Sequence, residues 1–258
     1  MTRQVTLEGV ENFRDFGDYA TAGGRRLKKG LLYRSAAQGR ATQADLETIA
    51  SLNIAVVVDL RRRGERLRDP ARRYPAFAGQ IIENDLGDDE EDSWQAHIRG
   101  SDLSEASFRN YLLAYYRDAP FEARHIDLFG RYFHAVAKAD GAVLIHCAAG
   151  KDRTGILAAL THHLAGVPSA DILADYLLTN DPRRVASRAP MVANAIEEIA
   201  GRAPTMNALK VAMGVEPAYL QAALSAITER HGSVDAYLEG ALGVNRAARD
   251  LIEARLLG

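Results

Sequence analysis

Hydrophobic and polar positions follow two periodicities along the chain: short, nearly continuous apolar runs, and longer stretches with helical spacing. Residues 54–60 and 143–145 are mostly apolar and β-branched, which is typical of strands covered on both faces. Residues 31–35 and 81–82 are shorter runs of the same kind, and we expect strands there too. Such strands separated by helical segments predict a central, mostly parallel sheet.

Helical spacing of apolar residues predicts the elements between and after these strands. Thr42 suits the N-cap of a helix that carries Leu46, Ile49 and Leu52. Further helices are expected within residues 104–139 (two, broken near Pro120), after residue 155, and over 169–179, 189–200, 217–231 and 245–257. We therefore predict one α/β domain over residues 1–258, with helices flanking the sheet, a helical lid-like insertion at 104–139 and a helical C-terminal part.

Composition places the chain among ordinary soluble globular proteins. It has 258 residues, of which 47% are hydrophobic and 26% charged, and its formal net charge is −2. That charge gives no indication of a nucleic-acid partner or of an anionic membrane surface. The first residues lack the apolar core of a signal peptide, and no apolar run has the length of a membrane-spanning helix. We expect a cytoplasmic protein without membrane insertion, and secretion by a route that needs no signal peptide stays open.

The only cysteine, Cys147, lies in the stretch His-Cys-Ala-Ala-Gly-Lys-Asp-Arg-Thr-Gly over residues 146–155. This stretch connects an expected strand to an expected helix, so its backbone N–H groups would converge at a helix N-terminus that suits an anion. The helix dipole and Arg153 would favour ionisation of the thiol. Cys147 is therefore a candidate nucleophile aimed at a phosphate.

Other interpretations of this loop fit the residues less well. A nucleotide-binding loop requires a glycine where Ile145 stands, and Asp152 replaces its Ser or Thr. A thioredoxin-like motif, a disulfide or a cysteine-rich zinc site would need a second cysteine. An inert core cysteine is the common fate of a lone thiol, but it explains neither the arginine six positions later nor the glycine between them.

The loop resembles the signature of the protein tyrosine phosphatase superfamily, and most nearly that of bacterial tyrosine and dual-specificity phosphatases with His-Cys-x-x-Gly-Lys-Asp-Arg-Thr-Gly. Segments 12–15, 32–35 and 59–61 with Glu65, and Tyr237-Leu238 near the C-terminus, are similar to that group as well, so the resemblance covers essentially the full chain. It implies a phosphomonoester hydrolase that needs neither a cofactor nor a metal.

Each position of the loop has chemistry that agrees with this resemblance. Cys147 would attack phosphorus and form a cysteinyl-phosphate, while the planar fork of Arg153 would hold two phosphoryl oxygens. Thr154 could donate its hydroxyl hydrogen to the sulfur, and His146 would orient the loop through hydrogen bonds. Backbone N–H groups would wrap the phosphate along Ala148, Ala149, Gly150, Lys151, Asp152 and Arg153.

The carboxylic acid that protonates the leaving oxygen has several candidates. Asp85 matches best by its order along the chain in the bacterial group. Asp152 is an alternative, because a carboxyl group this close to a bound dianion retains its proton more readily, although it could instead position the loop. Asp59 is a weaker rival that we expect to brace the loop together with Arg61. Near Asp85, the residues that compete with it are Asp88, Asp89, Glu90, Glu91 and Asp92.

Two further groups of charged residues have open roles. Lys151 resembles a second cation that contacts extra phosphates in phosphoinositide phosphatases, or it is a solvated lysine. Arg14-Asp15 and Arg34 could reach the edge of the site, but we favour an ion pair that fastens the N-terminal segment. The pair His162-His163 has no third ligand at suitable spacing, so a metal there is not expected.

We predict a protein tyrosine phosphatase of broad, dual specificity that acts on a phosphorylated protein. A phosphoinositide phosphatase is the first alternative, and a catalytically silent module that binds phosphorylated ligands is the second. Sulfur transfer of the rhodanese kind is disfavoured because that loop is shorter before its arginine.

Overall fold

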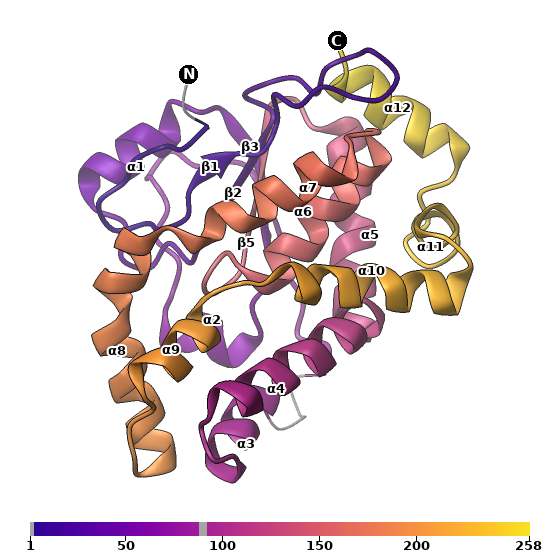
Figure 1. The fold of residues 1–258 in the computed structure, drawn as a ribbon. Coiled ribbons are helices and arrows are strands. Elements are labelled where there is room, and N and C mark those ends of the chain that lie inside the picture. The colour runs from indigo at the N-terminus through magenta and orange to yellow at the C-terminus, as the bar shows by residue number, and fades with distance from the viewer. Residues whose placement is uncertain (1–2, 88–91) are drawn as a thin grey trace.

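The computed structural model describes residues 3–87 and 92–258 and is built around a five-stranded sheet (Figure 1). The strand order is β1-β2-β5-β3-β4, with β1 antiparallel to β2 and every other neighbouring pair parallel. The expected α/β fold with a mostly parallel sheet is therefore confirmed. The strands are β1 Arg14–Asp15, β2 Leu32–Ser35, β3 Ile54–Asp59, β4 Gln80–Ile82 and β5 Ala142–His146.

Helices cover both faces of the sheet and one of its ends (Figure 1). Short 3₁₀ turns at Ala119–Phe121 and Leu178–Asn180 follow α4 and α7. The helices are α1 Gln43–Ala50, α2 Arg63–Arg68, α3 Ser93–Gly100, α4 Glu105–Asp118, α5 Ala123–Lys138, α6 Asp152–Leu164, α7 Ser169–Leu177, α8 Pro182–Ala200, α9 Met206–Met213, α10 Pro217–His231, α11 Val234–Gly240 and α12 Arg246–Leu256.

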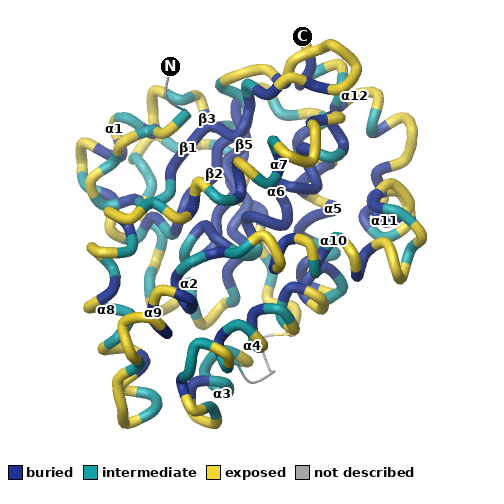
Figure 2. Tube along the Cα trace, in the orientation of Figure 1, coloured by how far each residue is buried: buried dark blue, intermediate teal, exposed yellow. Residues whose placement is uncertain are grey.

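The two faces of the sheet belong to two separate cores, and the sheet is buried throughout its centre (Figure 2). Val56 and Val58 of β3 pack with α5 and α6 in the larger core, whereas Val57 points to the smaller core under α1. Ile54 also belongs to the smaller core, which a strict alternation from Val56 would not allow. A register irregularity between Ile54 and Val56 accounts for this change of face.

Most of the expected elements are present. Thr42 caps α1 in a reciprocal capping box with Asp45, as expected for that position. Residues 105–118 and 123–138 form two helices broken around Pro120, and α10 has the expected bounds. The helices α2, α3, α9 and α11 were not predicted, and α8 begins at Pro182 rather than at Ala189.

The lid-like insertion expected at residues 104–139 is only partly correct. Helix α5 is not a lid, because Phe129, Tyr132 and Phe133 are fully buried in the larger core. The end of the molecule that lies beyond the sheet is instead formed by α3, the first part of α4, α8 and α9 (Figure 1). These helices share a third core that includes Ile98 and Phe108 on one side and Ile196 on the other.

Among the described residues, no helix combines the length and the apolar character that crossing a membrane requires.

Candidate active site

The loop that holds Cys147 connects the central strand β5 to the N-terminus of α6. In the sheet, His146 at the end of β5 lies beside Ser35 of β2 and Asp59 of β3. Three parallel strands therefore end at the same level around the loop, which is where open α/β sheets bind their ligands. Helix α6 begins at Asp152, so the first turn of a thirteen-residue helix points at the same place.

The carbonyl oxygens of the loop accept hydrogen bonds from residues in the N-terminal part of the chain. Ala37 N–H donates to the Ala148 carbonyl (3.0 Å), and the Asn12 amide donates to the carbonyls of Ala149 (3.3 Å) and Gly150 (2.7 Å). Because the N–H of a trans peptide points opposite to its C=O, the N–H groups of the next residues face away from this N-terminal segment. The loop backbone is thus oriented with its donors on the side of the cavity described below.

Gly150 is required by this arrangement. Its φ is +63°, and a Cβ atom at this position would lie 2.5 Å from the backbone carbonyl of Ser35. The close approach lets the Gly150 carbonyl accept hydrogen bonds from Asn12 and from Arg34 (3.1 Å).

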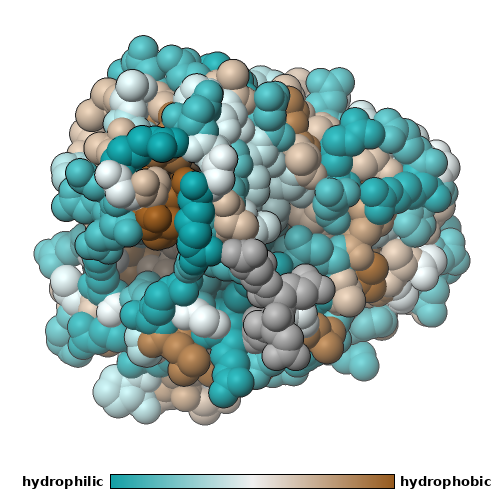
Figure 3. Space-filling view, turned by 90° about the horizontal axis from the view of Figure 1, so that it is seen from below, coloured by the Kyte–Doolittle hydropathy of each residue, from teal (hydrophilic) through white to brown (hydrophobic). Residues whose placement is uncertain are grey.

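Cys147, 2% exposed, lines a cavity of about 500 Å³ between the sheet end and the helices α4 and α8. Hydrophilic side chains surround a hollow with hydrophobic atoms in its depth on the face of the molecule seen in Figure 3. Among the described residues, seven basic and five acidic side chains line the cavity, and this excess of positive charge suits an anion. The basic ones are Arg62, Arg68, Arg124, Lys151, Arg153, Arg184 and Arg188, and the acidic ones are Glu65, Asp92, Glu122, Asp152 and Glu198.

Arg153 lines the same cavity and is held by Glu65 of α2. Its two terminal nitrogens donate to the two carboxylate oxygens at 2.5 and 2.7 Å, a bidentate ion pair. Burial alone would raise the pKa of Glu65, but the charge and hydrogen bonds of Arg153, together with the Arg62 amide and the charge of Arg124, lower that pKa to about 2. The guanidinium is therefore fixed in orientation before any ligand is present.

A buried ion-pair network ties the N-terminal segment to α7. Asp175 is 1% exposed and contacts Arg14 (3.2 Å) and Arg34 (2.8 Å), which are equally buried. Burial opposes the negative charge of Asp175, yet the two guanidinium groups hold its pKa well below the usual range. The ion pair expected for Arg14 and Arg34 is present, but its acidic partner is Asp175 rather than Asp15, whose side chain accepts from the Gly17 and Gly30 amides. Sequence reasoning did not identify Asp175 as a functional residue. The signal that could have identified it is an acidic residue on the apolar face of an expected helix.

Asp59 and Arg61 lie beneath the loop and outside the lining of the cavity. Arg61 binds the carboxylate of Asp59 through Nε (2.9 Å) and Nη2 (2.7 Å), and the His146 ring lies 3.6 Å from the same carboxylate. That His146 orients the loop through hydrogen bonds stays a prediction, and in the described chain neither ring nitrogen has a partner with good hydrogen-bond geometry. Its backbone carbonyl instead accepts from Leu60 N–H (2.8 Å).

Lys151 and Thr154 also differ from expectation. Lys151 is not solvated: it is 4% exposed, lines the cavity and donates to the Ala212 carbonyl (2.7 Å). Burial lowers the pKa of its amine, partly offset by Asp152. Thr154 is fully buried, and its hydroxyl has no hydrogen-bond partner in the described chain, so the bond to the Cys147 sulfur is not formed here.

The structure does not bring Asp85 to the cavity. Its side chain is 58% exposed and pairs with Arg66, outside the lining residues. Of its rivals, Asp92 lines the cavity, while residues 88–91 lie outside the described part of the chain. Asp152 lines the cavity from the phosphate loop itself, and its Oδ1 accepts a hydrogen bond from Tyr116 (2.8 Å).

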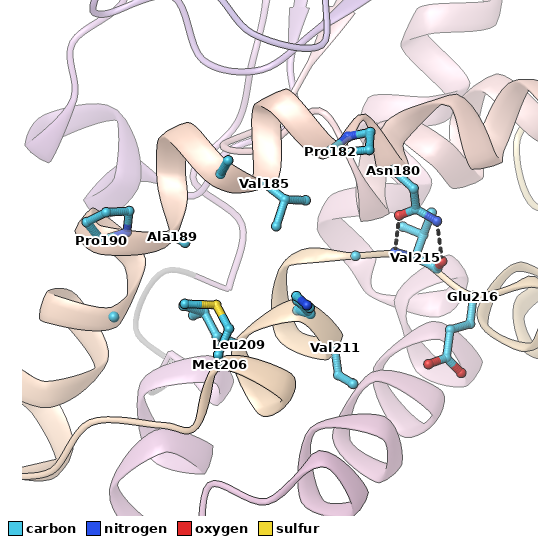
Figure 4. Close-up of a pocket in the computed structure, with 14 residues that line it drawn as sticks. Asn180, Pro182, Val185, Ala189, Pro190, Met206, Leu209, Val211, Val215 and Glu216 are labelled. Atoms are coloured by element: carbon cyan, nitrogen blue, oxygen red, sulfur yellow. Dashed lines mark hydrogen bonds between the residues drawn. The ribbon is translucent and has the colours of Figure 1, made fainter.

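A second cavity of about 770 Å³ lies on the other side of α8, between it and α9 (Figure 4). Val185 and Ala189 of α8 face this cavity, whereas Arg184 and Arg188 face the one that contains Cys147. Asn180 closes one end through two hydrogen bonds to the backbone of Val215 (2.8 and 2.9 Å). Among the described residues its lining is predominantly aliphatic and includes no cysteine, so the candidate chemistry belongs to the cavity that Cys147 lines.

Comparison with known proteins agrees with this geometry. A Cupriavidus necator protein whose name assigns it to the tyrosine-protein phosphatases is 34% identical over 246 residues, covering 94% of this chain and 85% of its own. The triple specificity protein phosphatase PtpB of Mycobacterium tuberculosis is 33% identical over 282 positions, covering 98% of each chain. A tyrosine-protein phosphatase of Nostoc commune is 34% identical over 149 residues, 57% of this chain. The model of the tyrosine phosphatase family matches residues 5–258, and the chain belongs to this family and is a phosphatase.

Proposed function

We propose that this phosphatase hydrolyses phosphomonoesters through a cysteinyl-phosphate intermediate and has broad specificity that includes phosphotyrosine. The observation that carries the proposal is that Cys147 and Arg153 line one cavity from a loop whose carbonyls are fastened on the opposite side. The Lys151-Asp152 pair within this loop supports placing the chain in the bacterial subgroup with that sequence.

The reaction has two steps on the phosphate loop. The Cys147 thiolate attacks phosphorus, the S–P bond forms, and the P–O bond to the leaving group breaks as that oxygen takes a proton. Water then attacks phosphorus, the S–P bond breaks, and inorganic phosphate leaves. Loop N–H groups and the Arg153 fork stabilise the charge on the equatorial oxygens in both steps, without a metal or another cofactor.

Asp152 is the acid we propose for the first step, in preference to Asp85. It lines the cavity in the same loop as Cys147, and its side chain is 22% exposed. Of the other carboxylates that line the cavity, Glu65 is bound to Arg153, and Asp92 caps α3 by accepting from the amides of Trp94 and Gln95. Asp152 would donate its proton to the leaving oxygen and then, as carboxylate, accept one from the attacking water. With phenyl phosphate, Asp152→Asn should lose most of the rate while Asp85→Asn retains it.

A phosphoinositide is the second candidate substrate. Lys151 and Arg184 line the same cavity as Cys147 and are positioned to meet a further phosphate, while Tyr111 and Tyr115 offer an aromatic wall for a phosphotyrosine ring. PtpB, a relative over the full chain, is named for triple specificity. Rates on a phosphotyrosine peptide and on a soluble inositol phosphate would rank the two substrates.

The covalent mechanism is tested with two variants and an aryl phosphate. Cys147→Ser should have no turnover and still bind orthovanadate, whereas Arg153→Ala should lose both turnover and binding. Activity of the wild type should persist in a chelator. Hydrolysis by the Cys147→Ser protein would refute the cysteinyl-phosphate, and an inactive wild type would favour a silent binding module.

A further inference from the structure

Two buried tyrosine hydroxyls lead from the interior of the protein to Asp152. Tyr176 of α7 donates to the hydroxyl of Tyr116 (2.7 Å), and Tyr116 of α4 donates to Oδ1 of Asp152 (2.8 Å). Tyr116 and Tyr176 are 0% and 1% exposed, whereas Asp152 reaches the cavity. The two hydrogen bonds run in one direction, from Tyr176 through Tyr116 to Oδ1 of Asp152.

The tyrosines remain donors throughout the range in which a phosphatase works. Burial, together with the negative charge of Asp152, raises the pKa of Tyr116 well above its usual value. Burial is also the main cause that raises the pKa of Tyr176. Both hydroxyls therefore keep their protons at neutral pH and can donate the hydrogen bonds that end at Oδ1.

Lys151 is the other described group that contacts the Asp152 carboxyl group, and it lies on the same side as Tyr116, next to Oδ1. Lys151 Nζ lies 3.6 Å from Oδ1, and its short contact goes to the Ala212 carbonyl (2.7 Å). The charge of Asp152 also acts on four other groups near it, namely Arg184 of α8, Tyr111 and Tyr115 of α4 and Tyr219 of α10. Arg153, the next residue, is bound to Glu65. Among the described residues, Tyr116 therefore makes the short hydrogen bond to this carboxyl group (2.8 Å), and the Lys151 amine forms a longer ion pair with the same oxygen (3.6 Å).

We propose that Tyr116, backed by Tyr176, is a positioning residue that selects which oxygen of Asp152 carries the transferable proton. With Oδ1 engaged as an acceptor, the proton resides on Oδ2 and can be directed at the leaving oxygen. As the P–O bond breaks, the Oδ2 proton moves to that oxygen, and the bond electrons remain with it. The carboxylate that forms is stabilised by the Tyr116 hydroxyl until it takes a proton from the attacking water. This inference rests on the proposed role of Asp152 as the acid.

The test is the pH dependence of kcat/KM for Tyr116→Phe and Tyr176→Phe. The general acid must be protonated in the first step, so the basic limb of the profile reports on that acid. Removing the Tyr116 donor destabilises the ionised form, so the basic limb should move to higher pH by about one unit. Tyr176→Phe should move it in the same direction by less. Tyr116→Phe should also slow phenyl phosphate more than p-nitrophenyl phosphate, because the poorer leaving group depends more on the proton.

Tyr132→Phe is the matched control, since Tyr132 is equally buried and its hydroxyl lies 2.9 Å from the Thr161 hydroxyl in the larger core. Its pH profile should coincide with that of the wild type. If both Tyr116→Phe and Tyr176→Phe keep the wild-type limb while Asp152→Asn removes it, Asp152 is the acid and the positioning role is wrong. If Asp152→Asn keeps the wild-type limb, the acid assignment fails and the positioning role falls with it.

Discussion

Replacing Asp175 with asparagine is the most demanding test of how the phosphate loop is held. The single carboxylate is the shared counter-ion of two guanidinium groups, Arg14 and Arg34, in a region with no more than 4% side-chain exposure. The asparagine has nearly the same shape, so the change removes charge rather than volume. It leaves two buried cations without a counter-ion, one of which donates to the Gly150 carbonyl.

The expected loss in the free energy of unfolding is about 3–5 kcal/mol, the usual consequence of removing one partner of a buried ion pair. That is a large part of the roughly 5–15 kcal/mol that stabilises a typical domain. For a chain of this size it corresponds to a melting temperature lower by about 6–20 °C. The loop should loosen as well, because Arg34 is no longer held in the direction of Gly150.

The difference should depend on pH with a definite sign. The two arginines hold the pKa of Asp175 below its usual range, so the stability it contributes is present above the unfolded-state pKa of about 4. This contribution is lost as pH falls toward the folded-state pKa. Wild type and Asp175→Asn should therefore differ most near neutral pH and converge on acidification.

Urea unfolding followed by circular dichroism at several pH values measures this difference, provided that the slope with denaturant is unchanged. Asp18→Asn is a matched control, because Asp18 makes its ion pair with Arg26 at an exposed position and should cost less than about 1 kcal/mol. A loss below about 1 kcal/mol for Asp175→Asn, or a difference that stays constant below pH 4, would refute the reasoning.

Two further substitutions test the loop itself. Gly150→Ala should destabilise the protein by more than about 2 kcal/mol and reduce kcat/KM on the order of tenfold, because the left-handed backbone is strained and the added Cβ meets Ser35. Gly24→Ala, at φ +78° with no atom within 4 Å, should show the backbone cost alone and unchanged activity. Glu65→Gln should weaken orthovanadate binding on the order of tenfold, because the bidentate pair that orients Arg153 is lost; unchanged inhibition by orthovanadate would contradict that role.

Local patterns predicted the parts of the fold that local physics determines. The strands at residues 54–59 and 142–146 carry β-branched runs, and Thr42 has both the side chain and the spacing of a cap. Helix α8 was predicted to begin seven residues late, although Asp181-Pro182 is a strong start signal, because the apolar spacing is regular only after Pro190. The short helix α2 has no buried residue and therefore no apolar pattern to detect.

The candidate site likewise contains contacts that the sequence predicts and contacts that it does not. Cys147 and Arg153 are six positions apart on one loop, so their spacing alone brings them together. Asp175 meets Arg14 across 161 positions, and Tyr116 meets Asp152 across 36, through the packing of helices whose mutual arrangement no local pattern encodes. The acid assignment by order along the chain favoured Asp85 for a related reason: sequence order places a residue near a strand end but does not determine which way it points.

The restraints on the loop have a consequence for catalysis as well as for stability. Fixing one backbone residue costs about 1–2 kcal/mol in conformational entropy, so a flexible loop would lose several kcal/mol on closing around a phosphate. Here Asn12, Arg34 and Ala37 hold three successive carbonyls before any ligand arrives, and the energy of folding supplies that ordering. The N–H groups then act as preorganised donors that need not rearrange as charge develops on the phosphoryl oxygens. The described part of the N-terminal segment contributes none of the cavity lining, and in the proposed mechanism it would support catalysis by ordering the loop.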